Sequence, residues 1–139
     1  MNLITDRTKS DVLLRTEKGL YGSVDLNRVE TAVAELIALA KALDVNCDLK
    51  VKTDWGLPEE FSTESWSTKG QMERYLSNVN RLCQAMELEA DIPSSMKHLT
   101  WEGANQIEQA LELVYVRIQT ILQVFQFSGE IFAGEENYI

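Results

Sequence analysis

The residues best suited to chemistry are a group of carboxylates in the segment from Asp54 to Ser67. Four acids are mixed there with three large aromatic residues: Asp54, Glu59, Glu60 and Glu64 with Trp55, Phe61 and Trp66. A carboxylate pair can cleave a glycoside, and aromatic rings beside carboxylates can bind a sugar. No spacing in the segment fixes two of these acids at a catalytic separation. We therefore favour a long loop, residues 54–67, whose rings anchor it on the rest of the protein.

Histidine and cysteine form no catalytic or metal-binding motif. His98 is the only histidine, and no serine, cysteine or ordered acid motif accompanies it, which favours a structural or solvated side chain over a general base. Cys47 and Cys83 lie outside any CxxC or Cys/His spacing, which predicts buried free thiols in a reducing compartment. We therefore predict no catalytic residue, no cofactor and no metal.

The composition is typical of one globular domain that covers residues 1–139. The nearest candidate for a membrane span, Ala32–Leu43, is too short to cross a bilayer, and Met1–Asp6 lacks the pattern of a secretion signal, which favours the cytoplasm. The net charge is −9, and the residues from Thr100 onward hold six acids and one arginine. Such a surface repels a phosphate backbone, so we expect no nucleic-acid partner. We also expect no membrane partner, because no apolar run is long enough to cross a bilayer. A solvated acidic face is a more common explanation than an acidic mimic of DNA.

One long helix, predicted from Leu99 to Ser128, must position the other elements. Thr100 begins it and Gly129 ends it. Its apolar residues recur at steps of three and four and share one face: Trp101, Ala104, Ile107, Leu111, Val114, Ile118, Leu122 and Phe125. Other apolar residues of its second half point away from this face, so that half needs neighbours on more than one side.

Three further helices are predicted before this one. A short helix lies within Thr5–Lys18, a second runs from Ser23 to Leu43, and a third spans Lys69–Met86 after the cap Thr68. The outer face of the third helix carries Glu73, Arg74, Asn78 and Arg81. Between the second and third helices, alternation of apolar and polar residues within 45–55 predicts an extended piece that buries one side.

The predicted fold is therefore all-α. It is an antiparallel bundle of three longer helices plus a short N-terminal helix, with the long aromatic loop and an extended C-terminal tail, residues 129–139. We expect the tail to fold back on the bundle or to reach another chain.

Two sets of residues are candidates for a site. Asparagines in helices and oppositely charged residues one turn apart predict a structural polar network of Asp25, Asn27, Arg28, Arg74, Asn78, Glu102 and Asn105. Within it we expect Asp25 to pair with Arg28 and Glu102 to pair with Gln106. Gly103 predicts close passage of the linker around Pro93. The candidate interaction surface is Leu113, Val116, Val124, Phe127, Trp55, Phe61, Trp66, Ile131, Phe132 and Tyr138.

Several sequence blocks resemble a known group of proteins. They are Asp6-Arg7-Thr8, Asp25-Leu26-Asn27-Arg28-Val29-Glu30, Gln71-Met72, Arg74-Tyr75-Leu76, Pro93-Ser94-Ser95-Met96 and Glu102-Gly103-Ala104-Asn105. Across nearly the whole chain, such blocks resemble small structural proteins encoded in tail modules of phages and prophages of Gram-positive bacteria. The resemblance implies a non-enzymatic virion or tail-like particle component, present in several copies, whose partners are itself or other particle proteins. Capsid-connector, baseplate and fibre-associated roles stay open.

Two other functions remain alternatives. One is a cytoplasmic helical adaptor or regulatory module that binds a partner in a groove between helices. The more remote one is a glycan-active enzyme that uses the carboxylates of the 54–67 loop.

Overall fold

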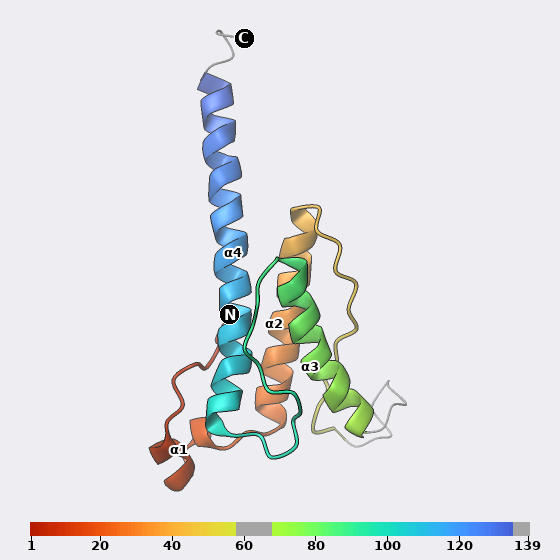
Figure 1. Cartoon of the computed structure of the whole chain (residues 1–139), viewed down its shortest axis with the longest axis vertical. Helices are drawn as coiled ribbons and strands as arrows, with labels where there is room; N and C mark the ends of the chain where they lie inside the picture. Colours follow the sequence, from red (N-terminus) through yellow and green to blue (C-terminus); the bar gives the residue numbers. More distant parts are fainter. Residues whose placement is uncertain (58–67, 135–139) are drawn as a thin grey trace.

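Helices make up all the regular structure in the residues that the computed structural model describes, 1–57 and 68–134. The side chains of residue 68 and of residues 125–134 lie outside that description. In chain order the elements are α1 (Lys9–Leu13), the 3₁₀ helix η1 (Glu17–Gly19), α2 (Ser23–Ala42), α3 (Thr68–Ala85) and α4 (Trp101–Gly134) (Figure 1). The prediction of an all-α fold with three longer helices and a short N-terminal helix is confirmed.

The three long helices run in the same direction, so the predicted antiparallel arrangement is wrong (Figure 1). Early residues of all three helices meet: Glu30 of α2 pairs with Arg74 of α3, and Arg28 of α2 pairs with Glu108 of α4. Parallel neighbours require long connections. An extended chain advances about 3.3 Å per residue against 1.5 Å in a helix, so about ten extended residues return along a helix of 20.

The ends of α2 and α3 start these returns. The residues after each helix include one in the left-handed conformation, Asp44 (φ 60°) and Glu87 (φ 57°). The amide of the following residue, Val45 or Leu88, donates a hydrogen bond to the carbonyl five positions earlier, at 3.0 and 2.9 Å. This is a Schellman ending, in which the apolar residue after the turn packs back on the helix. It reverses the chain without a glycine.

Residues 45–51 lie extended against the bundle. Their side chains alternate between half-buried and exposed, as predicted for a piece that buries one side. In place of a strand partner, the carbonyl of Lys50 accepts hydrogen bonds from Arg74 Nη1 (2.7 Å) and Asn78 Nδ2 (2.6 Å). Arg74 and Asn78 therefore face this segment, and the prediction that they lie on the outer face of α3 is wrong. Asn78 is buried.

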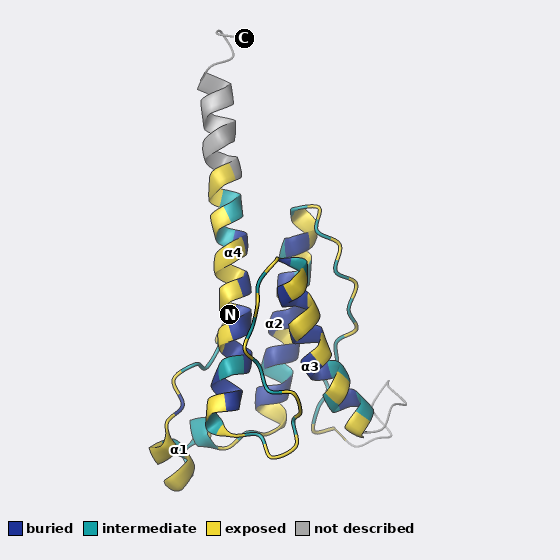
Figure 2. Ribbon diagram, viewed as in Figure 1, coloured by how far each residue is buried: buried dark blue, intermediate teal, exposed yellow. Residues whose placement is uncertain are grey.

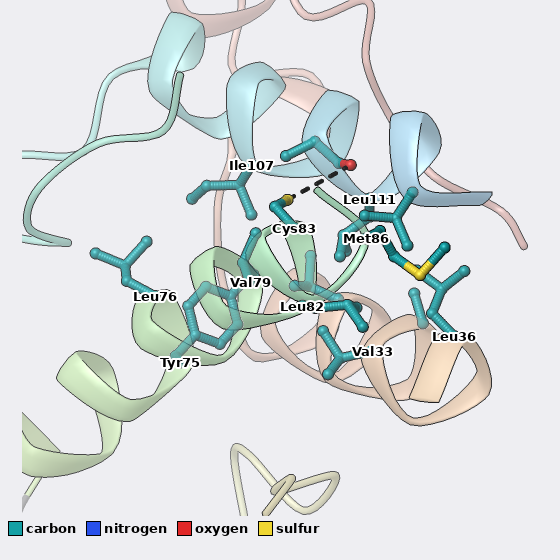
Figure 3. Close-up of a cluster of buried hydrophobic side chains, with 14 of the residues drawn as sticks. Val33, Leu36, Tyr75, Leu76, Val79, Leu82, Cys83, Met86, Ile107 and Leu111 are labelled. Carbon is teal, nitrogen blue, oxygen red and sulfur yellow. Dashed lines mark hydrogen bonds between the residues drawn. The ribbon is translucent and has the colours of Figure 1, made fainter. Parts of the chain in front are cut away.

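The core lies between the facing sides of α2, α3 and α4 (Figures 2 and 3). The predicted apolar stripes supply it, and its buried residues are Leu26, Val29, Ala32, Val33, Leu36, Ala40, Tyr75, Leu76, Val79, Leu82, Cys83, Met86, Ile107, Ala110, Leu111, Val114 and Ile118. Leu88, Ile92, Met96 and Leu99 of the 86–100 connection pack against it.

The start of α4 follows the prediction closely. The side chain of Thr100 accepts a hydrogen bond from the amide of Gly103 (3.0 Å), which is the contact of an N-cap. A Cβ atom on Gly103 would lie 2.9 Å from the ring of Pro93. The linker around Pro93 therefore does pass close to this glycine, as predicted.

The far end of α4 differs from the prediction, because the helix passes Gly129 and ends at Gly134. Glycine inside a helix costs only about 1 kcal/mol relative to alanine, so one glycine does not by itself end a helix. The predicted tail therefore begins inside α4, and residues 135–139 lie outside the described part of the chain. None of the helices described has the length and apolar character needed to cross a membrane.

The N-terminal helix lies within the predicted segment Thr5–Lys18 and is five residues long. Thr8 caps α1, and Thr8 and Asp11 form a capping box, but the helix ends at Leu13. Gly19 closes η1, where a Cβ atom would lie 2.2 Å from the carbonyl oxygen of Asp11. Thus Gly19 permits close packing of η1 on α1 and does not terminate the first helix.

Candidate functional site

A buried ion network joins the N-terminal segment, α2 and α4. Its carboxylates are Glu108, which is 0% exposed, and Asp25. Arg7 Nη2 lies 2.6 Å from Glu108 Oε2 and 3.3 Å from Asp25 Oδ1. Arg28 reaches Glu108 Oε1 with Nε (2.7 Å) and Asp25 Oδ1 with Nη2 (2.7 Å). We call these four residues and Asn105 the Glu108 network.

Backbone contacts hold the N-terminal segment in the Glu108 network. Asn105 Oδ1 accepts from the amide of Arg7 (3.0 Å), and Asn105 Nδ2 donates to the carbonyl of Arg7 (2.9 Å). The amide of Ile4 donates to Glu108 Oε1 (3.0 Å). The first residues of the chain thus lie along α4, fixed by side chains about one hundred positions later.

A second buried network is built around Glu30, which is 1% exposed. Arg74 pairs with both of its oxygens, at 2.8 and 2.7 Å, and the indole Nε1 of Trp55 donates to Oε2 (2.7 Å). Asn27 exchanges two hydrogen bonds with the backbone of Trp55, at 2.8 and 3.1 Å. We call Glu30, Arg74, Trp55 and Asn27 the Glu30 network; it ties the 45–57 segment to α2 and α3.

These networks are suited to holding elements together. The Glu108 network contains two cations and two anions, and the Glu30 network one of each, so both are electrically neutral. The hydrogen bonds that Arg28 donates to Glu108 raise the pKa of Arg28. Among the described residues, no buried side-chain nitrogen or oxygen lacks a hydrogen-bond partner. The carboxylates of both networks are buried and accept hydrogen bonds from neighbouring side chains. The networks therefore fix the register of the parallel helices.

The hydroxyl groups of Tyr21 and Tyr75 share a short hydrogen bond between the two networks. Arg7 lies over the ring of Tyr21, 5.4 Å from its centroid. Burial raises the pKa of both phenols above the ordinary value of 10.0.

We therefore expect the protein to lose stability at alkaline pH through this tyrosine pair. Below about pH 10 both hydroxyls are neutral in the folded and unfolded states, and their contribution is fully present. Above it the unfolded state ionises first, so the free energy of unfolding falls as the pH rises. Denaturant unfolding at pH 8, 10 and 11 measures this. The double variant Tyr21→Phe/Tyr75→Phe should show a shallower fall, and an equal fall would contradict the assignment.

The structure brings most of the predicted network residues into contact, but in two groups. Asp25, Arg28 and Asn105 belong to the Glu108 network, and Asp25 pairs with Arg28 as expected. Asn27 and Arg74 belong to the Glu30 network, with Asn78 on the adjacent Lys50 carbonyl. Glu102 is exposed and joins neither network.

Sequence reasoning missed the central members, Arg7, Glu30 and Glu108. A signal existed for the two acids. Glu30 lies four residues after Leu26 and three before Val33, and Glu108 has the same spacing from Ala104 and Leu111, so both lie on buried faces. A charged residue on such a face requires a paired partner. Arg7, in an irregular segment, carried no comparable signal.

The predicted interaction surface separates into an exposed part and an anchored part. On α4, Leu113, Val116 and Val124 are 52%, 53% and 60% exposed, on the side away from the core. We call these three residues the α4 row. Trp55 instead is half-buried in the Glu30 network, as expected for a loop anchor. The remaining predicted side chains lie outside the described part of the chain: Phe61, Trp66, Phe127, Ile131, Phe132 and Tyr138.

The other residues considered for chemistry are dispersed. His98 is exposed, and Asp54 pairs with Lys52 at 2.6 Å, while Glu59, Glu60 and Glu64 lie outside the described residues. Cys83 is buried and free, and burial raises the pKa of its thiol to about 11; Cys47 is half-buried, so full burial was predicted correctly only for Cys83. Within the described residues, no group of three or more His, Cys, Asp or Glu side chains could hold a metal ion.

An open groove of about 980 Å³ runs between α3 and residues 90–97. Met72, Leu76, Ile92 and Met96 give it an apolar floor, and charged residues such as Lys69 and Glu73 also line it. A groove of this kind can receive an amphipathic segment of a partner.

The chain matches no family model, and neither curated proteins nor solved structures include one that is detectably similar to it. The resemblance to phage tail-module proteins therefore stays a prediction.

Proposed function

We propose that this chain is a non-enzymatic structural protein that assembles with other copies of itself through the exposed side of α4. The observation that carries the proposal is the α4 row. Three large aliphatic side chains, Leu113, Val116 and Val124, are more than half exposed on one side of a helix whose other side forms the core. Exposed apolar side chains gathered along one element mark interaction sites more often than scattered ones do.

The charge distribution supports the same proposal. The chain carries −9 overall, yet residues 113–134 contain one arginine and one glutamate and are neutral in sum. Repulsion between acidic copies is therefore weakest along this segment. Figure 1 also supports the proposal, since α4 extends past the ends of α2 and α3.

The sequence resemblance extends this proposal to a biological setting. The protein would be made in the host cytoplasm and then built into a virion or tail-like particle of a phage or prophage. Mass spectrometry of purified particles from a strain encoding the chain should then detect it in several copies per particle. Its absence from such particles would contradict the particle role and leave self-assembly to be judged separately.

The assembly proposal predicts a native mass above the 15.8 kDa of one chain. The variant Leu113→Gln/Val116→Gln/Val124→Gln should return the protein to the monomer mass, because it removes the apolar row and keeps good helix formers. Sedimentation equilibrium over a range of concentrations measures the mass. Circular dichroism and thermal unfolding check that the bundle is intact.

The matched control places the same substitutions elsewhere. Leu13, Leu14 and Val24 are 71%, 75% and 75% exposed and lie outside α4. Their triple glutamine variant should keep the wild-type mass. A wild-type protein that stays monomeric at every concentration, or an oligomer that the α4 variant leaves intact, would refute the proposal.

The groove between α3 and residues 90–97 favours a second candidate function, the adaptor module. An adaptor that uses this groove would bind a partner segment as a monomer. The same mass measurement therefore separates the two candidates.

A further inference from the structure

The exposed side of α4 has the register of a seam between two helices. Leu113, Val116 and Thr120 are separated by three and then four residues, the spacing of the a and d positions of a heptad. All three are exposed. In this register Glu112 occupies position g and Arg117 occupies position e, one on each flank of the apolar positions.

We propose that this side of α4 binds the α4 of a second copy in parallel orientation. The inference rests on the proposed assembly function and specifies its partner and geometry. In a parallel pair, position g of one helix lies opposite position e of the other helix, five residues later. Glu112 would therefore face Arg117 of the second copy, and the same pair would form on the opposite flank.

The charges select the parallel orientation. An antiparallel pair would set position g against position g and position e against position e, so Glu112 and Arg117 of the two copies would lie on different flanks and could form no ion pair. Both side chains are exposed, and in the described part of the structure neither forms an ion pair within its own chain. Both are therefore available to a second copy.

Thr120 is compatible with a central position in the seam. Its hydroxyl donates a hydrogen bond to the carbonyl of Val116 in the same helix, at 2.9 Å. Covering this side chain with a second copy therefore buries no unpaired hydroxyl, and its methyl group is available for packing.

The seam continues nearly straight along α4. Val124 follows Thr120 by four residues and Leu113 by eleven. An eleven-residue repeat advances 3.67 residues per turn, close to the 3.6 of a straight helix, whereas a strict heptad winds to the left. A second copy can thus follow α4 over several turns with little supercoiling.

Charge exchange tests the pairing. Glu112→Arg places cations on both flanks of the seam, and Arg117→Glu places anions on both. Each variant alone should associate about tenfold more weakly than the wild type, because both ion pairs become repulsive. An equimolar mixture of the two variants should regain the wild-type affinity, since each cation then faces an anion. Sedimentation equilibrium measures all four samples.

A cross-linking experiment tests the register. In a parallel seam the two residues at position 120 lie opposite each other, so Thr120→Cys in a Cys47→Ser background should form a disulfide-linked dimer under mild oxidation. Tyr115→Cys in the same background is the control, because position 115 is exposed on α4 but lies away from the seam. It should remain a monomer in the denaturing gel.

The outcomes separate the two proposals. A wild type that never associates refutes both the parallel pair and the proposed assembly function. A wild type that associates while both charge variants associate equally well, or while Thr120→Cys does not cross-link, refutes the parallel pair and leaves assembly through α4 in place.

Discussion

Replacing Glu108 with glutamine should destabilise the fold by about 3–5 kcal/mol, because the change leaves the buried Arg7 and the half-buried Arg28 facing one carboxylate. Glu108 is fully buried and binds Arg7 at 2.6 Å and Arg28 at 2.7 Å. Glutamine has nearly the same shape, so packing is kept, but the charge is lost and one of the two acceptor oxygens becomes an NH2 donor that faces other donors. A typical domain has a free energy of unfolding of about 5–15 kcal/mol, so the variant should still fold but with a much smaller free energy of unfolding.

Urea denaturation of the wild type and Glu108→Gln at neutral pH measures this loss. The matched control is Glu35→Gln, the same substitution at an exposed position of α2, which should change the stability by less than about 0.5 kcal/mol. A Glu108→Gln variant as stable as the control would show that the Glu108 network is not needed for stability.

The Glu108 network also shows why part of the fold could be predicted. The periodic apolar residues of α2, α3 and α4 are a local signal, because a helix repeats every 3.6 residues whatever it packs against. The same periodicity contains Glu30 and Glu108, so their burial could have been inferred. The part played by Arg7 could not, because Arg7 is fixed by contacts about one hundred residues away.

The helix direction depends on features that leave little trace in a sequence. Antiparallel packing is the simplest expectation for consecutive helices, but here each connection returns along the bundle. The returns begin at Asp44 and Glu87, which adopt a left-handed conformation that glycine usually marks. Hydrogen bonds from Arg74 and Asn78 to the Lys50 carbonyl then hold one return in place. Neither feature follows from hydrophobic pattern alone.

The two sides of α4 illustrate what pattern does reveal. Both the core-facing residues and the α4 row recur at helical spacing, so the sequence predicts two apolar sides, with the α4 row as part of the candidate interaction surface. The structure assigns them: Ile118 is fully buried, while Val116, two residues earlier, is 53% exposed. Substitutions at these two positions should therefore affect different properties.

Truncating Ile118 to alanine should destabilise the fold by about 2–5 kcal/mol, because it removes buried methyl groups and leaves a cavity between α4 and its neighbours. Ile118→Val removes a single methyl group and should cost about 0.5–1.5 kcal/mol. Val116→Ala, on the exposed side, should leave the stability of the monomer within about 0.5 kcal/mol of the wild type. Thermal and urea unfolding at a concentration low enough to keep the protein monomeric measure all three.

Self-association should be affected more by the substitution at Val116 than by the substitution at Ile118. Val116→Ala removes contacts from the proposed seam and should weaken association, whereas Ile118→Val leaves the exposed side unchanged and should preserve it. If Ile118→Ala unfolds the chain, Ile118→Val can still be compared with Val116→Ala. A loss of stability from Val116→Ala that equals the loss from Ile118→Ala would mean that both sides of α4 are covered by its own chain, and the α4 row could then not serve as an interface.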